Sequence, residues 1–187
     1  MRVVRFLLVL VGLGLLSGCA SYQPPSQQAL HRELIAPYRL DSGDRLRVIV
    51  FGQTDLSNTF TVDQAGMISM PLIGTVVARG RTTGEIERDV AAKLRAGYVR
   101  NPDVSVEVDR YRPFFAMGEV SAPGQYPYVA GLTVQAAVAI AGGFSPRADK
   151  LSVDVTRSIG GEIETGQLNL TDPLLPGDTF TVRERLF

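Results

Sequence analysis

From Tyr38 onward the chain consists of short segments in which apolar and polar residues alternate, and turn residues separate these segments. A period of two is typical of β-strands that bury one face, so this pattern restricts the folds open to the chain. Two segments, residues 82–97 and 134–141, read as helices instead. Many short strands with two helices predict the α+β class.

Residues 38–110 are predicted to form a first α+β unit in the order strand, hairpin, helix, strand. Its first and last strands each bury one face through alternating apolar side chains. Residues 60–72 read as a hairpin turned at residues 63–66. Pro71 lies inside the returning strand and predicts an edge or a bulge there, because proline has no N–H for the ladder.

The segment from Thr82 to Gly97 has the strongest helical signal. Thr82 and Glu85 have the spacing of a capping box, in which each side chain accepts a hydrogen bond from a backbone N–H of the first turn. Gly97 is expected to end the helix in the left-handed conformation. The apolar residues that share one helical face are Ile86, Val90 and Leu94.

A second unit is predicted for residues 111–187. A strand follows the boundary, and Pro123-Gly124 fits a type II turn with Gly124 at positive φ. Thr133 is suited to cap the second helix, and Gly142-Gly143 to stop it. Gly160-Gly161 is expected to turn a hairpin, and a final strand runs through Phe180 and Val182. One sheet crossed by one helix suits a β-grasp arrangement.

Two similar turns precede strands in the two units. Ser42-Gly43-Asp44 precedes the first strand, and Pro176-Gly177-Asp178 precedes the last. Glycine permits a tight turn, and the aspartate can accept hydrogen bonds from nearby backbone N–H groups. The pattern therefore indicates a turn and, alone, says nothing of function.

The start of the chain has the anatomy of a secretory signal. Arg2 and Arg5 give a positive start, and residues 6–16 are almost entirely apolar. This run is shorter than the roughly 20 residues of a spanning helix. Residues 1–18 are therefore predicted to be a lipoprotein signal peptide, and residues 19–37 a polar, lipidated tether.

Cys19 is the sole cysteine of the chain. Leu16-Ser17-Gly18-Cys19 resembles the bacterial lipobox, in which the cysteine becomes the acylated N-terminus. Ala20 follows it, and this implies sorting to the outer membrane. The alternative is an ordinary signal peptide cleaved nearby, for example after Ala20, with no anchor. Cys19 is the predicted lipid-anchor residue.

The charge balance argues against a nucleic-acid partner. Removing Met1–Gly18 removes two arginines and no acid, which leaves 17 basic against 19 acidic residues. Nucleic-acid-binding domains normally carry a strong basic excess.

The sequence offers no catalytic set, and we predict neither an enzyme nor a metal or cofactor site. His31 is the single histidine and lies in the tether, so a histidine-based triad or zinc site is not expected. Carboxylate pairs suited to glycan hydrolysis occur at Glu107/Asp109 and Glu162/Glu164. Both pairs alternate with apolar residues and are interpreted as the solvated face of a strand.

Aromatic residues could stack on sugars, and several gather near the start of the second unit. Without tryptophan or a visible groove, core packing is the preferred interpretation. These residues are Tyr111, Phe114, Phe115, Tyr126 and Tyr128.

An ordered series of motifs carries a family resemblance over nearly all of Tyr38–Arg185. Four stretches resemble the polysaccharide-export domain of bacterial outer-membrane lipoproteins: Tyr38–Leu46, Val62–Gly74, Thr82–Leu94 and Asn101–Val106. Three more resemble a soluble-ligand-binding β-grasp (SLBB) domain: Gly118–Tyr126, Ala136–Phe144 and Pro176–Asp178.

The resemblance implies a non-enzymatic export role on the periplasmic side of the outer membrane. Members of the family form homo-oligomeric rings through which capsular or exopolysaccharide polymer leaves the cell. They work with an inner-membrane polysaccharide co-polymerase, often coupled to a tyrosine kinase. Long members continue into a membrane-spanning helix after the last domain. This sequence stops after the final strand, so we expect a ring or adaptor served by a separate outer-membrane β-barrel.

Two other interpretations stay open. A periplasmic glycan-binding or regulatory module would use the β-grasp unit to bind a soluble ligand. A glycan-modifying enzyme is the third, and the missing catalytic set argues against it.

Overall fold

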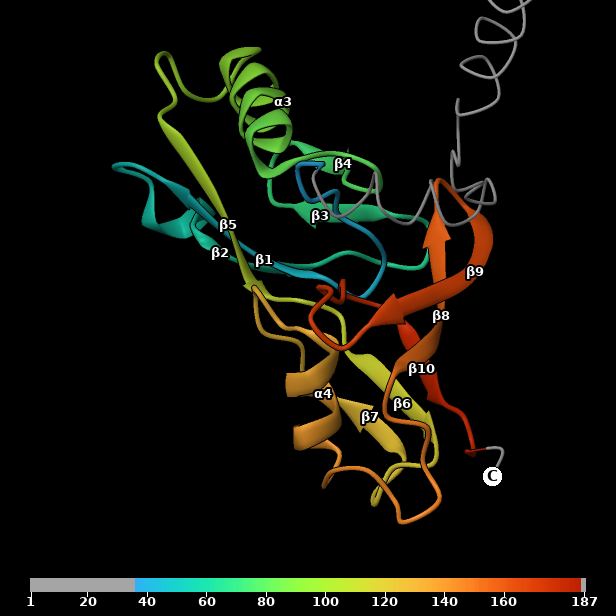
Figure 1. Ribbon diagram of the computed structural model, residues 1–187. Coiled ribbons are helices and arrows are strands. Elements are labelled where there is room, and N and C mark those ends of the chain that lie inside the picture. The colour runs from blue at the N-terminus through green and yellow to red at the C-terminus, as the bar shows by residue number, and fades with distance from the viewer. Residues whose placement is uncertain (1–35, 186–187) are drawn as a thin grey trace, which may run out of the picture.

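The computed structural model describes residues 36–185, which form two packed units (Figure 1). One cluster of buried side chains draws on residues 40–106 and the other on residues 114–182. The predicted signal peptide, Cys19, His31 and most of the predicted tether lie outside the described residues. The mixture of short strands and two α-helices confirms the predicted α+β class.

The first unit contains a three-stranded antiparallel sheet in the order β2-β1-β5 and a separate β3-β4 ribbon. The alternating segments form strands because one face of each is buried: Leu46, Val48 and Val50 of β1 are all inaccessible to solvent or nearly so. The elements are β1 (Arg45–Val50), the 3-10 helix η2 (Thr54–Leu56), β2 (Asn58–Thr61), β3 (Met67–Met70), β4 (Gly74–Val77), α3 (Thr83–Arg95) and β5 (Val104–Arg110).

The predicted hairpin over residues 60–72 is wrong in its pairing. β2 pairs with β1, whereas β3 pairs with the following β4, from Met67 opposite Val77 to Met70 opposite Gly74. A tight turn does exist, since the Asp63 N–H donates to the Met67 carbonyl at 2.9 Å. The chain then diverges into a second ribbon. Pro71 follows the end of β3, where no ladder N–H is needed.

Helix α3 confirms the predicted capping box and buried face. Its inward residues Ile86, Val90 and Leu94 are fully buried. The predicted left-handed end at Gly97 is wrong, because Gly97 does not have a positive φ. The N–H groups of Tyr98 and Val99 both reach the Leu94 carbonyl at 2.9 Å, so this carbonyl is satisfied without a left-handed residue.

The cap of α3 gives a first prediction. The Thr82 hydroxyl accepts the Glu85 N–H at 3.3 Å, and the Glu85 carboxylate accepts the Thr82 N–H at 2.7 Å. Thr82→Ala should lower the free energy of unfolding by about 1 kcal/mol in urea titrations. The hydrogen bond from Thr82 lowers the pKa of Glu85. Its stabilisation is therefore present above the unfolded-state pKa and is lost as the pH falls through the lowered one.

The second unit has one five-stranded sheet in the order β7-β6-β10-β8-β9, with β10 parallel to β6. Helix α4 packs on one face, and this arrangement confirms the predicted β-grasp unit (Figure 1). The elements are β6 (Phe114–Gly118), β7 (Gly124–Tyr126), α4 (Val134–Ile140), β8 (Ser152–Ile159), β9 (Glu162–Asn169) and β10 (Thr179–Val182).

Glycines shape this sheet, although one of them differs from the prediction. Gly142-Gly143 and Gly160-Gly161 adopt positive φ, as their helix-stop and hairpin roles require. Gly124 does not, and it opens β7 instead of completing a type II turn. The positive φ lies earlier, at Gly118, where a Cβ would overlap the Val182 carbonyl oxygen. Glycine at this position allows β6 and β10 to approach closely.

Candidate functional site

The candidate site contains two buried aspartates, one in each of the two Gly-Asp turns. Asp44 and Asp178 are both 0% exposed. The Asp44 carboxylate accepts the Asp41 N–H at 2.9 Å, and the Asp178 carboxylate accepts the Leu175 N–H at 2.8 Å. The glycine before each aspartate has a positive φ. The weak repeat in the sequence is therefore a repeated local structure with a buried carboxylate.

Asp178 is also bound by a buried arginine from β8. Arg157 Nε donates to Oδ1 at 2.8 Å, and Nη2 donates to Oδ2 at 2.7 Å. This two-point geometry is the strong form of an arginine–carboxylate pair. The Arg157 side chain is 4% exposed, so the pair lies within the second unit rather than on its surface.

Arg112 joins the two turns across the boundary between the units. Its Nε donates to the Pro176 carbonyl at 2.9 Å, and its Nη1 lies 3.6 Å from carboxylate oxygens of Asp41 and Asp44. Its backbone N–H donates to the Asp44 carboxylate at 2.9 Å. A Cβ on residue 177 would overlap the Arg112 guanidinium, which explains why glycine stands in the second turn. One side chain thus bridges both turns.

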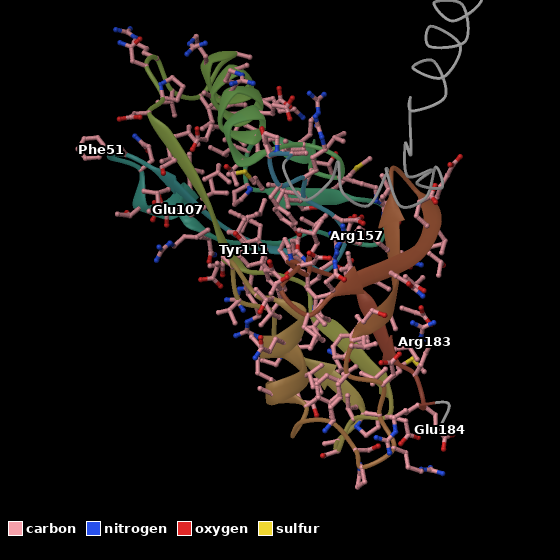
Figure 2. All side chains as sticks on the ribbon, in the orientation of Figure 1. Phe51, Glu107, Tyr111, Arg157, Arg183 and Glu184 are labelled. Carbon is pink, nitrogen blue, oxygen red and sulfur yellow. The ribbon has the colours of Figure 1, made fainter. Side chains whose placement is uncertain are left out.

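A row of three tyrosines reinforces this junction. Tyr111 makes edge-to-face contacts with Tyr38 and Tyr128, with ring centroids 5.1 and 5.4 Å apart. Figure 2 places Tyr111 and Arg157 near the middle of the molecule, where the units meet. The Tyr38 hydroxyl donates to Asp44 at 2.6 Å, and burial, followed by the Asp44 charge, raises its pKa. Tyr38 therefore remains a proton donor at any physiological pH.

A groove of about 840 Å³ lies between the units and receives residues from both, including Arg79, Arg112 and Gly160. Its polar side chains are used internally. Arg79 Nε donates to Asp41 at 2.9 Å, and Arg39 Nη1 donates to the Gly80 carbonyl at 2.7 Å. Both of these bonds lie within the first unit, whereas Arg112 contacts residues of both units. The groove presents no nucleophile with an adjacent base.

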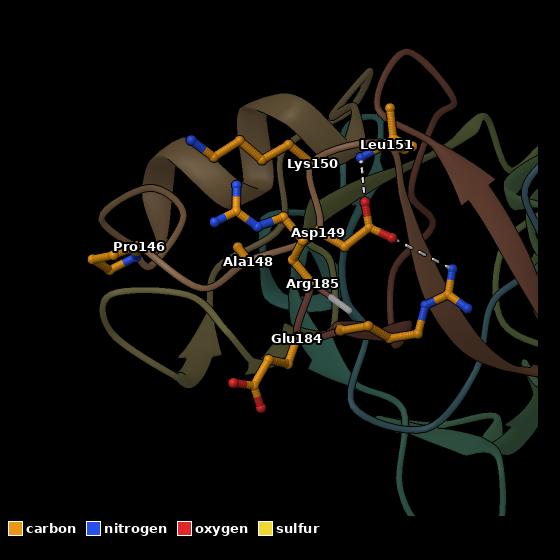
Figure 3. Close-up of a pocket in the computed structure, with 8 residues that line it drawn as sticks. Pro146, Ala148, Asp149, Lys150, Leu151, Glu184 and Arg185 are labelled. Atoms are coloured by element: carbon orange, nitrogen blue, oxygen red, sulfur yellow. Dashed lines mark hydrogen bonds and ion pairs between the residues drawn. The ribbon is translucent and has the colours of Figure 1, made fainter. Parts of the chain in front are cut away.

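A second hollow, of about 570 Å³, lies near the C-terminal end of the described chain (Figure 3). Asp149 accepts the Leu151 N–H at 2.9 Å and lies 4.0 Å from Arg183. Glu184 pairs with Arg147 at 3.2 Å. Both acids of the hollow therefore have arginine partners.

The carboxylate pairs considered in the sequence lie on strand surfaces. Glu107 pairs with Arg47 at 2.6 Å and Asp109 with Arg45 at 3.2 Å, across β1 and β5 (Figure 2). Glu162 and Glu164 lie on the edge strand β9. In the described part of the chain, no three His, Cys, Asp or Glu side chains gather closely enough to hold a metal ion. Neither helix there is long and apolar enough to cross a membrane.

The aromatic residues divide between three environments. Phe114 stacks with Tyr126 at 5.7 Å and with Phe180 at 6.2 Å in the core, as core packing predicts. Tyr111 and Tyr128 belong to the junction. Phe115 differs, because it points outward from the sheet and is 38% exposed.

Sequence reasoning found the two turns but missed the arginines that complete them. Both arginines are distant in sequence from the turn residues they bind: Arg112 is 64 positions from Pro176, and Arg157 is 21 positions from Asp178. No local pattern marks such partners. The repeated Gly-Asp was the sequence signal that could have pointed to these partners. An aspartate that becomes buried needs a nearby cation or several hydrogen-bond donors.

Comparison with known proteins identifies the class. Residues 34–109 match the family described as polysaccharide biosynthesis/export protein, and residues 117–166 match the SLBB domain. The chain therefore carries a polysaccharide-export domain followed by an SLBB domain.

Its relatives include named export proteins. The chain is 38% identical over 124 residues to the exopolysaccharide production protein ExoF of Rhizobium meliloti (strain 1021), covering 60% of this chain and 29% of ExoF. It is 30% identical over 114 residues to the EPS I polysaccharide export outer membrane protein EpsA of Ralstonia solanacearum, covering 48% and 30%. It is 28% identical over 142 residues to the polysialic acid transport protein KpsD of Escherichia coli, covering 75% and 25%. The chain spans less than a third of the length of each.

Proposed function

We propose that this protein is a component of a machine that exports capsular polysaccharide or exopolysaccharide. The observation that carries the proposal is the succession of an export domain and an SLBB domain, held together by Arg112 and the tyrosine row. The names of ExoF, EpsA and KpsD all refer to the production, export or transport of a polysaccharide. Because the two units are held in a fixed orientation, copies of the chain can pack against one another around a passing polymer.

The proposed location is the periplasmic side of the outer membrane, with the protein anchored by lipid on Cys19. In this scheme residues 1–18 are the signal peptide and residues 19–37 the tether. Residues 38–110 form the export domain, and residues 111–187 form the SLBB domain. EpsA, which is named as an outer membrane protein, supports this location.

The proposed partners are the polysaccharide polymer, further copies of this chain in a ring, and an inner-membrane co-polymerase coupled to a tyrosine kinase. The role is non-enzymatic. The acids of β5 and of the C-terminal hollow support this view, because arginines pair with them.

Deletion of the gene tests the export role. We expect polysaccharide outside the cell to disappear and to return when the intact gene is restored. Unchanged secretion would contradict the export role and favour a glycan-binding or regulatory module. Unchanged amount with altered sugar composition would favour an enzyme.

The anchor gives a separate prediction. Cys19→Ser should leave the fold intact, since Cys19 precedes every residue of both buried clusters. The variant should leave the membrane fraction and become soluble in the periplasm, measured by fractionation and immunoblotting. Ser17→Ala is a matched control that keeps the cysteine. Retention of the Cys19→Ser protein in the outer membrane would contradict the lipid anchor.

A further inference from the structure

The five-stranded sheet of the second unit has one face that no described element covers. Helix α4 packs on the opposite face, against Phe114, Phe180 and other inward side chains. On the uncovered face, which we call the open face, residues from successive strands lie directly opposite one another. The register forms one row of Gln125, Phe115, Thr179, Thr156 and Thr165, and a second of Met117, Thr181, Asp154 and Gln167.

These rows cross the strands and form a mostly polar surface. Adjacent positions in a row are separated by the strand spacing of about 4.8 Å. Their side chains are mostly hydroxyls and amides, which both donate and accept hydrogen bonds. The charged side chains on the open face, Asp154 and Arg183, lie 3.6 Å apart and offset each other. The surface is therefore suited to an uncharged, hydroxyl-rich partner rather than to a strong polyanion.

Two exposed apolar side chains of β6 distinguish this part of the open face from an ordinary solvated sheet. Threonines need no special explanation, because they favour strands and antiparallel sheets often have one wet face. Phe115 and Met117 are different, since they are 38% and 52% exposed on the same strand. They border a shallow hollow of about 500 Å³ with Pro123, Gln125 and Thr179. An aromatic ring and a polar row thus meet at one place.

We infer that the open face binds a short stretch of the exported glycan, laid across the strands. The Phe115 ring stacks on the apolar face of one sugar, as aromatic rings do on flat apolar surfaces. The threonines and Gln125 then meet the hydroxyls of the neighbouring sugars at the repeat set by the strands. This inference rests on the proposed export function and names its substrate contact.

The test measures binding by the full-length lipidated protein in detergent. The probe is a set of oligosaccharides of six to ten sugars, obtained by mild hydrolysis of the polymer that the same cells secrete, and titrated by calorimetry. Phe115→Ala should weaken binding about tenfold. Phe51→Ala is the matched control, because Phe51 is 81% exposed at the far end of the first unit and should leave the affinity unchanged (Figure 2).

A second variant keeps the test independent of Phe115. Thr165→Lys places a long charged side chain on the edge strand β9, at the end of the first row. Binding should be weakened while thermal unfolding is unchanged. Three results would overturn the inference: no binding by the unaltered protein, equal binding by all three variants, or a Phe115→Ala protein that changes oligomer size but not affinity. The last would assign the face to contacts between proteins. Because the gene deletion measures secretion without any binding assay, failure of this inference and failure of the export role give different results.

Discussion

Replacing Asp178 by alanine should lower the free energy of unfolding by about 3–5 kcal/mol, the usual cost of removing one partner of a buried ion pair. Asp178 is 0% exposed and receives two hydrogen bonds from the guanidinium of Arg157. It also accepts the Leu175 N–H at 2.8 Å. The variant removes the carboxylate from a buried guanidinium and the acceptor from a turn N–H. Urea unfolding followed by circular dichroism measures the loss.

Asp109→Ala is the matched control for this prediction. Asp109 also pairs with an arginine, Arg45, at 3.2 Å, but its side chain is 32% exposed. Solvent weakens such a pair, so its removal should cost less than about 1 kcal/mol. Replacing both partners, Arg157→Met with Asp178→Leu, should recover part of the stability but not all, because the Leu175 N–H still lacks its acceptor. Equal losses for Asp178→Ala and Asp109→Ala would contradict the buried-pair argument.

The elements of the fold were predictable where local chemistry decides them. Thr82 and Glu85 interact within one helical turn, and alternation in β1 follows from one buried face, so both were visible in the sequence. The partner of β3 was not visible. The alternation of residues 67–70 fits pairing with either β2 or β4, and the packing of the rest of the unit decides between them. The positive φ expected at Gly124 occurs instead at Gly118, because the Val182 carbonyl of β10, which is distant in sequence, leaves no room for a Cβ there.

The candidate site shows the same limit more sharply. Both Gly-Asp turns were recognised, because the turn and its strand are contiguous. That the two carboxylates are fully buried, and that one arginine lies between the turns, depends on how two units dock. The exposed position of Phe115 likewise depends on which face of β6 the helix α4 covers. The sequence favoured core packing for both aromatic residues of β6. Because side chains alternate along a strand, Phe114 faces the core and Phe115 faces outward.

Arg112→Ala should lower the free energy of unfolding by about 2–4 kcal/mol, because the buried Asp44 loses a nearby cation. The substitution should also change how the two units are coupled. Without the bond to the Pro176 carbonyl, the side chain no longer ties the second turn to the first. Units joined by a small interface move independently by default. We therefore expect the single unfolding transition to separate into two, one for each buried cluster.

Hydrogen exchange can resolve the two units, whereas tryptophan fluorescence cannot, because the chain contains no tryptophan. In the unaltered protein, amides of β1 and β10 should exchange with the same free energy, because both become exposed in one shared unfolding event. In Arg112→Ala they should exchange with different free energies. Arg147→Ala is the control, since that side chain is 70% exposed and its pairs are with surface acids. Arg112→Lys keeps the charge but loses the planar fork, so it should restore part of the stability near Asp44 while leaving the units uncoupled. A common opening in Arg112→Ala would mean that the tyrosine row alone holds the units together.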